Sequence, residues 1–451
     1  MRSALAAFPA VFGSVWRDER GVTLVLTALM MAVLLAITGL AVDAGWWYTL
    51  HRRNQSAADA AALSAAYELL NNSSWTSTNL TPFATSAAQQ NGYSGDTPDV
   101  TATSDRVEVV LHQPQGTWFA ALAGLNSVTI SNRAVAQIVT LDKPCMYVLN
   151  PTAPKALSII GSASLTATGC SICDNSDADD AVYMQGGHNA NIVADSLLIR
   201  GEMSETGSAT PTLKHPAQFG FSQCTDPFAS TLTHSYLTAD MPTKPACTKT
   251  GSTWSGNCVI AGTSISPGDT LSPDTQISGG LKIKNGTVDL SPGGNYWITD
   301  GDLTLDNGSG AGLTCSTCVN GTSGVTVIMT TASGNTVGGV NLDSNANLNL
   351  TAPSSGPFAG MVLIQDSNDL PNNTKFNPFS VQANAAETLS GLVYFPQSAM
   401  DFQGTPTASG PQCLLVVANT MTLQGNPAMV TTGCAQLNMT PPPIQTVTLV
   451  E

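Results

Sequence analysis

The hydrophobic pattern at the start of the chain is one long run without a charged side chain. Residues 22–42 read VTLVLTALMMAVLLAITGLAV. At about 1.5 Å per residue in an α-helix, such a run crosses a hydrocarbon core of roughly 30 Å. A secretory signal peptide has a shorter apolar stretch, of about 7–15 residues, followed by a cleavage site of small residues. The run therefore predicts one transmembrane helix.

The side chains of this run and just beyond it are typical of a membrane anchor. Two tryptophans and a tyrosine follow the run, and such residues gather at membrane–water interfaces. The residues expected to contact lipid are Val22, Leu24, Leu34, Leu35, Leu40, Val42, Trp46 and Trp47. A set of small residues, Gly39, Ala41, Ala44 and Gly45, is expected to pack against other membrane helices.

The helix is predicted to continue beyond the membrane to about residue 70. The stretch TLHRRNQSAADAAALSAAYELL contains no Gly or Pro and is rich in Ala and Leu, which favour helix. Its small and apolar positions leave Arg53, Ser56 and Asp59 on a polar side. Residues 21–70 therefore predict a single helix with one half in lipid and one amphipathic half outside it.

Residues 71–140 predict a small α/β domain. The expected helices are 80–93 and 117–125, and the expected strands are 100–103, 106–112 and 127–139. This α-β-β-α-β order favours a sheet with helices on one face. His112 is interpreted as the last residue of a strand rather than as a catalytic base.

From residue 141 to about 440 the pattern changes to short alternating strands. Apolar-x-apolar pairs recur about every 8–12 residues between turns of Gly, Asn, Ser or Asp. The residues predicted to point inward in one such stretch are Leu281, Ile283, Val288, Leu290, Tyr296, Ile298, Leu303 and Leu305. Units of this kind bury their apolar side chains only by stacking, which favours a right-handed parallel β-helix, or solenoid. An irregular β-sandwich is the alternative.

Two segments depart from the alternating pattern. Residues 202–270 are polar, rich in Pro, and contain Cys224, Cys247 and Cys258. We expect a loop insertion there, held by disulfides. Residues 441–451 are expected to form a Pro-rich tail.

The charge is unevenly distributed along the chain. Residues 1–53 carry five arginines against three acidic residues, whereas the rest carries 11 basic and 28 acidic residues. A domain this acidic repels phosphate, so nucleic acid is excluded as a partner. Arginines flank the apolar run on both sides, and charge therefore does not decide the orientation of the helix.

The cysteines decide the orientation instead. All ten lie beyond residue 140: Cys145, Cys170, Cys173, Cys224, Cys247, Cys258, Cys315, Cys318, Cys413 and Cys434. The two Cys-x-x-Cys pairs lack the helical context of redox sites, and their separation does not fit a zinc ribbon. Structural disulfides are therefore favoured, which requires an oxidising compartment. Residues 1–20 are expected to be cytoplasmic and the bulk of the chain extracytoplasmic.

The anchor region resembles a known family. The matching features are Arg-Gly before the apolar run, GLAVDAG at residues 39–45 and NQSAADAAAL at residues 54–63. Over residues 17–66 the chain is similar to the N-terminal segment of the TadE/TadG-like proteins of Flp (Tad) pilus assembly. The resemblance implies a single-pass protein of a bacterial inner membrane, with its bulk in the periplasm and with other pilus or secretion subunits as membrane partners.

One position departs from the pilin pattern. Pilins cleaved by a prepilin peptidase carry Glu at the fifth position after the Gly, and counting from Gly21 that position is Leu26. An accessory protein that stays in the membrane is therefore expected, rather than a polymerising pilin. The predicted function is a non-enzymatic accessory of pilus assembly or surface attachment.

Candidate chemistry in the outer part is sparse. An acidic run, Asp174, Asp177, Asp179 and Asp180, has oxygen ligands suited to calcium but departs from the EF-hand spacing. A membrane-tethered carbohydrate-active enzyme that uses Asp179 and Asp180, or a glycan-binding adhesin, is the alternative function. His215 and His234 are expected to stand alone in polar loops. No catalytic residue and no cofactor are predicted.

Overall fold

The structure is a computed structural model, and it forms two compact units. It describes residues 19–141, 143–243, 246–306, 310–319, 321–371, 373–382, 385–404, 407–408, 414–432 and 444–450. Unit 1 comprises Met1–Thr140 and Gln445–Glu451, and unit 2 comprises Leu141–Ile444. In sequence, unit 2 is thus inserted into unit 1.

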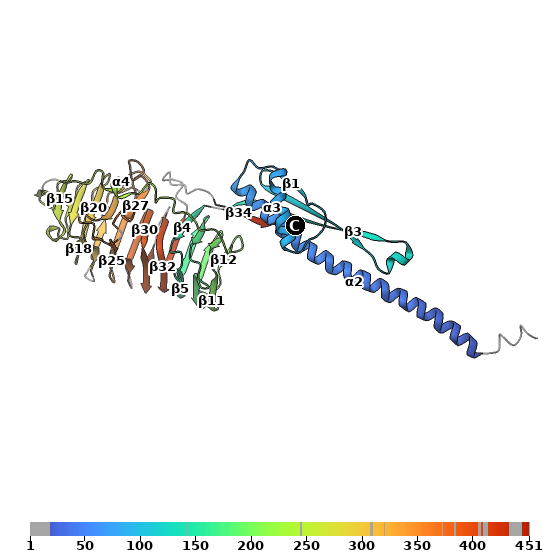
Figure 1. Ribbon diagram of the computed structural model, residues 1–451. Helices are drawn as coiled ribbons and strands as arrows, with labels where there is room; N and C mark the ends of the chain where they lie inside the picture. The colour runs from blue at the N-terminus through green and yellow to red at the C-terminus, as the bar shows by residue number, and fades with distance from the viewer. Residues whose placement is uncertain are drawn as a thin grey trace, which may run out of the picture. The chain divides into compact units, whose positions relative to one another are not determined.

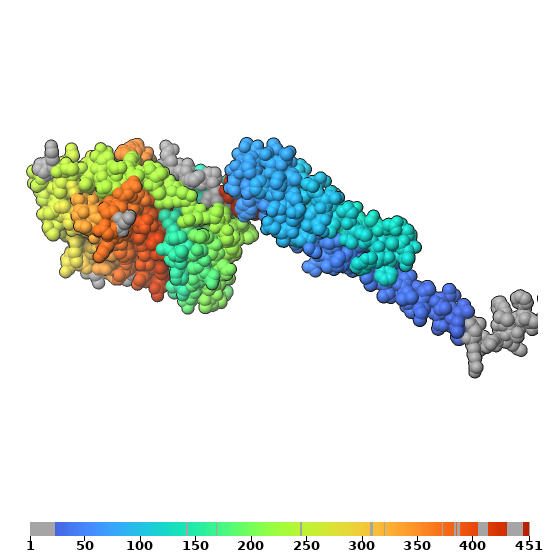
Figure 2. All heavy atoms as spheres, viewed as in Figure 1, coloured from blue at the N-terminus to red at the C-terminus, as the bar shows by residue number. Residues whose placement is uncertain are grey.

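Unit 1 is built on one very long helix. Helix α2 runs without interruption over Glu19–Asn71, 53 residues. Among the described residues it is the one helix long and apolar enough to cross a membrane. Its N-terminal part projects away from the rest of unit 1, and Figure 2 shows this part without neighbours on its visible side. The predicted long apolar helix is confirmed.

The sheet of unit 1 has four strands. The elements are α3 (Ser77–Gln90), β1 (Asp99–Ala102), β2 (Arg106–Gly116), the 3-10 helix η1 (Ala120–Ala123), β3 (Ser127–Leu141) and β34 (Ile444–Leu449). The spatial order is β1-β2-β3-β34, and β2 is antiparallel to both β1 and β3. The elements between residues 71 and 141 occur in the order that the sequence predicts.

A row of alanines joins α2 to this unit. The fully buried residues of α2 here are Ala57, Ala58, Ala61, Ala62, Ala65, Ala66 and Leu69. They pack with Leu80 and Ala84 of α3 and with Val107 and Val109 of β2 in one core. Because alanine side chains are short, the backbone of α2 can lie close to α3 and β2. The core between these elements is therefore tightly packed.

The C-terminal segment does not end as a tail. Ile444–Leu449 form β34 beside β3, and the N–H of Val450 donates to the carbonyl oxygen of Val135. Thr446 and Val447 are buried there. The sequence IQTVTLV alternates and is β-branched, which favours a strand once an unpaired edge is available.

Unit 2 consists of parallel ladders. The first contains, in order of pairing, β14 (Thr253–Trp254), β16 (Thr270–Leu271), β19 (Thr287–Leu290), β22 (Gly312–Thr314), β26 (Asn347–Thr351), the start of β30 (Ala386–Gly404), β31 (Thr407–Ala408), β33 (Ala428–Thr432), β6 (Ser164–Thr168), β9 (Asn191–Ala194) and β12 (Thr212–Leu213). The second contains β15 (Cys258–Ala261), β17 (Thr275–Ser278), β20 (Asn295–Thr299), β23 (Thr326–Thr330), β27 (Met361–Gln365), the middle of β30, the start of β32 (Leu414–Gly425), β4 (Pro144–Val148), β7 (Ser171–Asp174) and β10 (Leu197–Ile199).

The third ladder contains β18 (Leu281–Ile283), β21 (Leu303–Leu305), β25 (Val340–Leu342), β29 (Phe379–Val381), the ends of β30 and β32, β5 (Leu157–Gly161), β8 (Val182–Gly186) and β11 (Met203–Gly207). Outside the ladders lie β13 (Lys249–Thr250), the pair β24 (Thr336–Val337) and β28 (Lys375–Phe376), α4 (His234–Thr238) and η2 (Gly262–Ser264). Figure 1 shows the strands of unit 2 side by side in a row. The predicted mostly-β domain is confirmed.

The predicted inward positions are buried throughout. All eight residues named for the stretch from Leu281 to Leu305 expose 2% or less of their surface. Apolar residues at equivalent positions pair across the ladders, such as Leu281 with Leu303 and Ile277 with Ile298. The core of unit 2 therefore repeats from one strand to the next.

The chain enters the ladders in their middle. Strand β4, the first of unit 2, pairs with β32, which lies near its end in sequence. From β4 the chain builds outward to β12, and from β14 it builds back toward β32. Residues 214–248 connect the two outer ends, and we call this connection the strap. The expected loop insertion at residues 202–270 is therefore only partly correct. The beginning of this range forms β11 and β12, and its end forms β15 and the start of β16.

Candidate functional site

The predicted anchor residues lie on α2, and the rest of the protein leaves most of their side chains uncovered. Leu24, Leu34 and Leu35 expose 71%, 62% and 65% of their surface. Leu40, Val42 and Trp46 are exposed too, Trp47 is half-buried, and Val22 lies within the helix. A continuous exposed surface of large apolar side chains marks an interaction site rather than a water-facing one. This surface is the first candidate site.

A hairpin tip contacts α2 along the C-terminal half of the apolar run and at Asp43, just beyond it. The tip, residues 114–127, joins β2 to β3 and contains η1. The Asp43 carboxylate accepts hydrogen bonds from the backbone N–H groups of Trp118, Phe119 and Ala120 at 3.2, 2.9 and 2.7 Å. Asp43 is only 2% exposed. Hydrogen bonds to a charged acceptor are stronger than neutral ones, so this carboxylate fixes the tip on the helix.

The same contact changes the role expected for Gly39. A side-chain carbon added there would lie 2.5 Å from the Phe119 ring, so the glycine provides the space for that ring. Gly39 is therefore covered by this chain's own hairpin and is not free to pack on another helix. At about 100° per residue, it lies roughly opposite to Ala41, Ala44 and Gly45, which stay exposed. The predicted small-residue face was wrong in including Gly39.

A polar seam begins about two turns further along the helix, at His51. Asn132 of β3 donates to the His51 carbonyl oxygen at 3.1 Å and to Oε1 of Gln55 at 3.0 Å. Gln55 in turn donates to the Arg133 carbonyl oxygen at 2.9 Å and to Asp59 at 3.0 Å. Part of the NQSAADAAAL segment therefore holds α2 on β3, while its alanines fill the core.

This helix is also what the chain shares with known proteins. Residues 21–68 match the Tad family, described as putative Flp pilus-assembly TadE/G-like. The N-terminal region is Tad-like. The resemblance predicted from the motifs at residues 39–45 and 54–63 is confirmed. Neither the curated proteins nor the solved structures gave a match.

The Tad-like segment covers both halves of α2. It contains the exposed apolar run, Asp43, the α2 residues of the polar seam and all the alanines of the buried row. It ends before α3, so the hairpin that contacts Asp43 lies outside the match. The match supports involvement in Flp pilus assembly together with other subunits.

The disulfides lie in unit 2. The pairs are Cys145–Cys170, Cys173–Cys224, Cys247–Cys258 and Cys315–Cys318. The two Cys-x-x-Cys motifs thus differ, since Cys170 and Cys173 bond to separate partners and Cys315 bonds to Cys318. Structural disulfides are confirmed for these eight residues. Cys413 and Cys434 lie outside the described residues.

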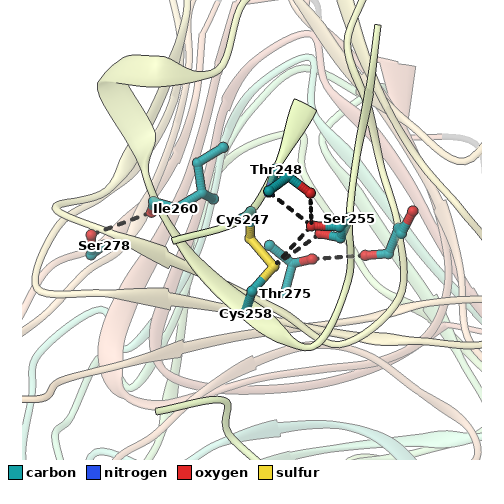
Figure 3. The surroundings of a disulfide bond; sticks show 8 residues. Cys247, Thr248, Ser255, Cys258, Ile260, Thr275 and Ser278 are labelled. Carbon is teal, nitrogen blue, oxygen red and sulfur yellow. Dashed lines mark hydrogen bonds between the residues drawn. A yellow bond between two sulfur atoms is a disulfide. The ribbon is translucent and has the colours of Figure 1, made fainter. Parts of the chain in front are cut away.

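Two of these disulfides hold the strap near its ends. Cys224 is bonded to Cys173 of β7, and Asn175 exchanges two hydrogen bonds with the backbone of Cys224, at 2.8 and 2.9 Å. At the other end, Cys247 is bonded to Cys258 at the start of β15, and its N–H donates to the Val259 carbonyl oxygen. Figure 3 shows this second disulfide beside Ser255, whose hydroxyl accepts from the Thr248 N–H at 2.9 Å.

Between its disulfides the strap crosses the strands of the second ladder. Tyr394 of β30 donates to Asp226 at 2.8 Å. Trp297 of β20 donates its indole N–H to the Leu237 carbonyl oxygen at 2.8 Å. The strap therefore contacts strands that are far apart in sequence and covers one face of unit 2.

A histidine–carboxylate pair joins the strap to the second ladder, and no local sequence pattern indicates it. His234 Nδ1 is 2.5 Å from Oδ2 of Asp366, and the Thr330 hydroxyl donates to the same oxygen at 2.6 Å. Burial raises the pKa of Asp366, although Thr330 and His234 act in the opposite direction. His234 was wrongly expected to stand alone, because its partner is 132 residues away. The pair fixes the strap to the ladder.

The four calcium candidates do not converge. Asp174 is buried at the end of β7 and accepts a hydrogen bond from the Ser176 N–H, and burial raises its pKa to about 7. Asp177 is exposed, with Arg200 at 3.5 Å, and Asp179 is exposed as well. In the part of the chain that the structure describes, no group of three or more His, Cys, Asp or Glu residues could hold a metal ion.

Proposed function

We propose that this chain is a membrane-anchored, non-enzymatic accessory protein of Flp/Tad-type pilus assembly or surface attachment. The observation that carries the proposal is α2, in which the Tad-like match and an exposed apolar run coincide over the same residues. One half of the helix lies in the bilayer. The other half is the central helix of unit 1, outside the bilayer.

We further propose the orientation of the chain. The disulfides of unit 2 support an oxidising compartment for the part of the chain beyond residue 140. The N-terminus is then cytoplasmic, whereas unit 2 and the part of unit 1 beyond the apolar run are periplasmic, on the outer side of a bacterial inner membrane. Ala41, Ala44 and Gly45 remain available for neighbouring subunit helices, because small residues permit close helix packing in lipid.

For unit 2 we infer a parallel β-solenoid. Strands that follow each other in a ladder are parallel, and from β16 onward the chain passes through all three ladders before it returns to the first. This order favours the solenoid over a β-sandwich, whose pairings are mainly antiparallel. Its crossovers are right-handed, as about 98% of parallel connections are. A solenoid offers an extended surface to partner subunits.

The buried acidic groups and the histidine of unit 2 form hydrogen bonds within the fold, which supports a non-enzymatic function. Asp366 and His234 hold the strap, and Asp226 accepts a hydrogen bond from Tyr394 of the same face. These groups serve the fold of unit 2. Its contribution to pilus assembly is then a binding surface.

Fractionation with protease protection tests the anchor and its orientation. The full chain is expected in the membrane fraction after alkaline carbonate extraction, and protease added to spheroplasts should digest unit 2. Replacing Leu34 and Leu35 by Arg should release the protein, because charges are costly at the centre of a membrane helix. Ser56→Arg, on the exposed side of the outer half of α2, is the matched control and should stay bound.

Two results would contradict the proposal. Unit 2 protected from protease in intact spheroplasts would place it in the cytoplasm. Normal pili and normal surface attachment in a strain that lacks the gene would remove the assembly function while leaving the anchor in place.

A further inference from the structure

The hairpin tip exposes a second apolar surface beside α2. Leu122 is 88% exposed, Trp118 60%, Leu125 51% and Phe119 44%. These side chains lie within a few residues of one another at the turn of a hairpin that Figure 1 shows running alongside α2. A cluster of large apolar side chains at a loop tip indicates a surface that contacts another protein or a membrane rather than water.

The tip also lacks the charges of a water-exposed turn. Between His112 and Arg133 the chain has no acidic or basic side chain. The surrounding sheet is different, since Glu108 and Arg133 form an ion pair on its outer side at 2.9 Å. The absence of charge is thus confined to the hairpin end that lies along the apolar run of α2.

The backbone of the tip is hydrogen-bonded internally. The N–H groups of Leu122, Gly124 and Leu125 donate to carbonyl oxygens of the same turn, and the Thr117 N–H donates to Asn126. The next three N–H groups, of residues 118–120, donate to Asp43. Each of these hydrogen bonds removes a polar group that would be costly to leave unsatisfied in a hydrocarbon layer, and Asp43 places part of this backbone against α2.

The depth of the tip follows from its contacts on α2. A hollow of about 550 Å³ lies between the two and is lined only by Ala, Leu and Phe. The lining residues are Ala32, Leu35, Ala36 and Leu40 of α2 and Phe119, Ala120, Leu122 and Ala123 of the tip. Ala32 lies about 15 Å along the helix from the end of the apolar run, half of a hydrocarbon core of roughly 30 Å. The tip therefore lies beside the outer half of that run.

We propose that this hairpin tip inserts into the outer leaflet of the same bilayer that α2 crosses, as a second, non-spanning membrane contact. The apolar hollow would then hold a lipid acyl chain. Trp118 stacks near Trp46 with ring centroids 5.9 Å apart, at the level of the interfacial aromatic residues. Asp43 holds the tip at this depth. The inference rests on the proposed membrane span of α2.

Lipid is favoured over a second copy of the chain because the apolar surface of the tip is continuous with that of α2. Leu122 and Leu35 border the same hollow, and both are exposed on its outer side. If α2 lies in lipid to the depth of Ala32, the tip beside it meets the same acyl chains. No separate partner is needed to cover it.

Photo-crosslinking tests the insertion directly. The full chain carries p-benzoylphenylalanine in place of Leu122 and is reconstituted in vesicles of phosphatidylethanolamine and phosphatidylglycerol. Mass spectrometry then identifies the adduct. Leu34, in the apolar run, is the positive control, and Tyr67, exposed on the outer half of α2, is the negative control. A lipid adduct is expected at positions 122 and 34 and not at 67.

The outcomes separate the two proposals. A lipid adduct at position 34 without one at 122 overturns the insertion of the tip and leaves the anchor. An adduct at 122 to a second copy or to another protein overturns it in favour of a protein interface. No lipid adduct at either position overturns the membrane span as well.

A charged tip gives an independent test. Leu122→Asp should expel the tip from the leaflet, so the backbone amides of residues 117–125 should exchange hydrogen about tenfold faster or more in vesicles. In detergent-free vesicles the matched variant Tyr67→Asp should leave these amides unchanged. Equal exchange in the Leu122→Asp variant and the parent chain would show that lipid does not protect the tip.

Discussion

The two halves of α2 are both apolar, yet they face opposite environments. In the first half, large residues such as Leu24 and Leu35 are exposed within the protein. In the second half, Ala57, Ala61 and Ala65 are completely buried. The apolar side chains of α2 thus change from an outward-facing surface to part of a core within the same 53 residues.

The size of the apolar side chains changes between the two halves in the same way as their surroundings. Large side chains cannot be packed on all sides of a helix by a small domain, so they suit a solvent of acyl chains. Alanines bury little area themselves but let α3 and the sheet approach the helix backbone. The change from Leu and Met to Ala along α2 therefore coincides with the change from the exposed surface, which we propose lies in lipid, to the core of unit 1.

Leu69→Ala should give the largest effect, because Leu69 is the one large residue in the fully buried row from Ala57 to Leu69. Removing it leaves a cavity and should destabilise unit 1 by about 2–5 kcal/mol. Hydrogen exchange of α2 and α3 peptides in the full chain measures the loss. Leu34→Ala is the matched control in the first half and should leave these peptides unchanged. Equal effects of both variants would contradict the comparison.

Ala61→Leu tests the same contrast by adding volume. Overpacking against α3 and β2 should cost about 1–3 kcal/mol, because no space surrounds Ala61. The loss should appear as faster exchange in α3 and as a lower thermal midpoint for unit 1. The identical change at exposed Ala41 should be close to neutral. A neutral Ala61→Leu would mean that the alanine row is not tightly packed.

Asn132→Ala tests the polar seam near the start of the second half. Loss of its bonds to His51 and Gln55 should cost about 1 kcal/mol, since these acceptors would be left in a partly dry site. Urea unfolding followed by exchange in β3 would measure it. Thr129→Ala, exposed on the same strand, should change stability by less. The reverse order would show that the seam does not hold α2.

Glu108→Gln concerns the water-facing side of unit 1 and should have the smallest effect, under about 1 kcal/mol. The hydrogen bond from Arg133 lowers the pKa of Glu108 from its usual value of 4.5. The pair therefore adds stability above that value and loses it as the pH falls further. A urea titration at pH 7 and at pH 3 should show a weaker pH dependence for the variant. An unchanged dependence would show that the pair contributes nothing measurable.

Sequence patterns predicted the elements that depend on local signals. Residues 22–42 lack charge and residues 46–70 lack Gly and Pro, so the long helix could be predicted directly. The alternation of Leu281, Ile283, Val288 and Leu290 likewise predicted which side chains are buried. Each of these signals is contained within a few neighbouring residues.

The remaining features depend on contacts between distant residues. Asp43 meets its hairpin partners 75 to 77 positions later, and His234 meets Asp366 132 positions later. The sequence around Asp43 and His234 contains no pattern that indicates these distant partners. The pairing of β4 with β32 was equally hidden, because alternation indicates a strand but not its neighbour. The Cys173–Cys224 pairing could not be read from spacing for the same reason.

The position of β34 has a consequence for the order of biogenesis. In the proposed orientation, unit 1 contains the first part of the chain to leave the membrane, yet its sheet lacks an edge strand until residues 444–449 have been exported. All of unit 2 would be translocated in between. During that interval β3 offers an unpaired edge to chaperones or to neighbouring subunits. Closure of the edge by β34 would then report that translocation has proceeded through the entire inserted unit.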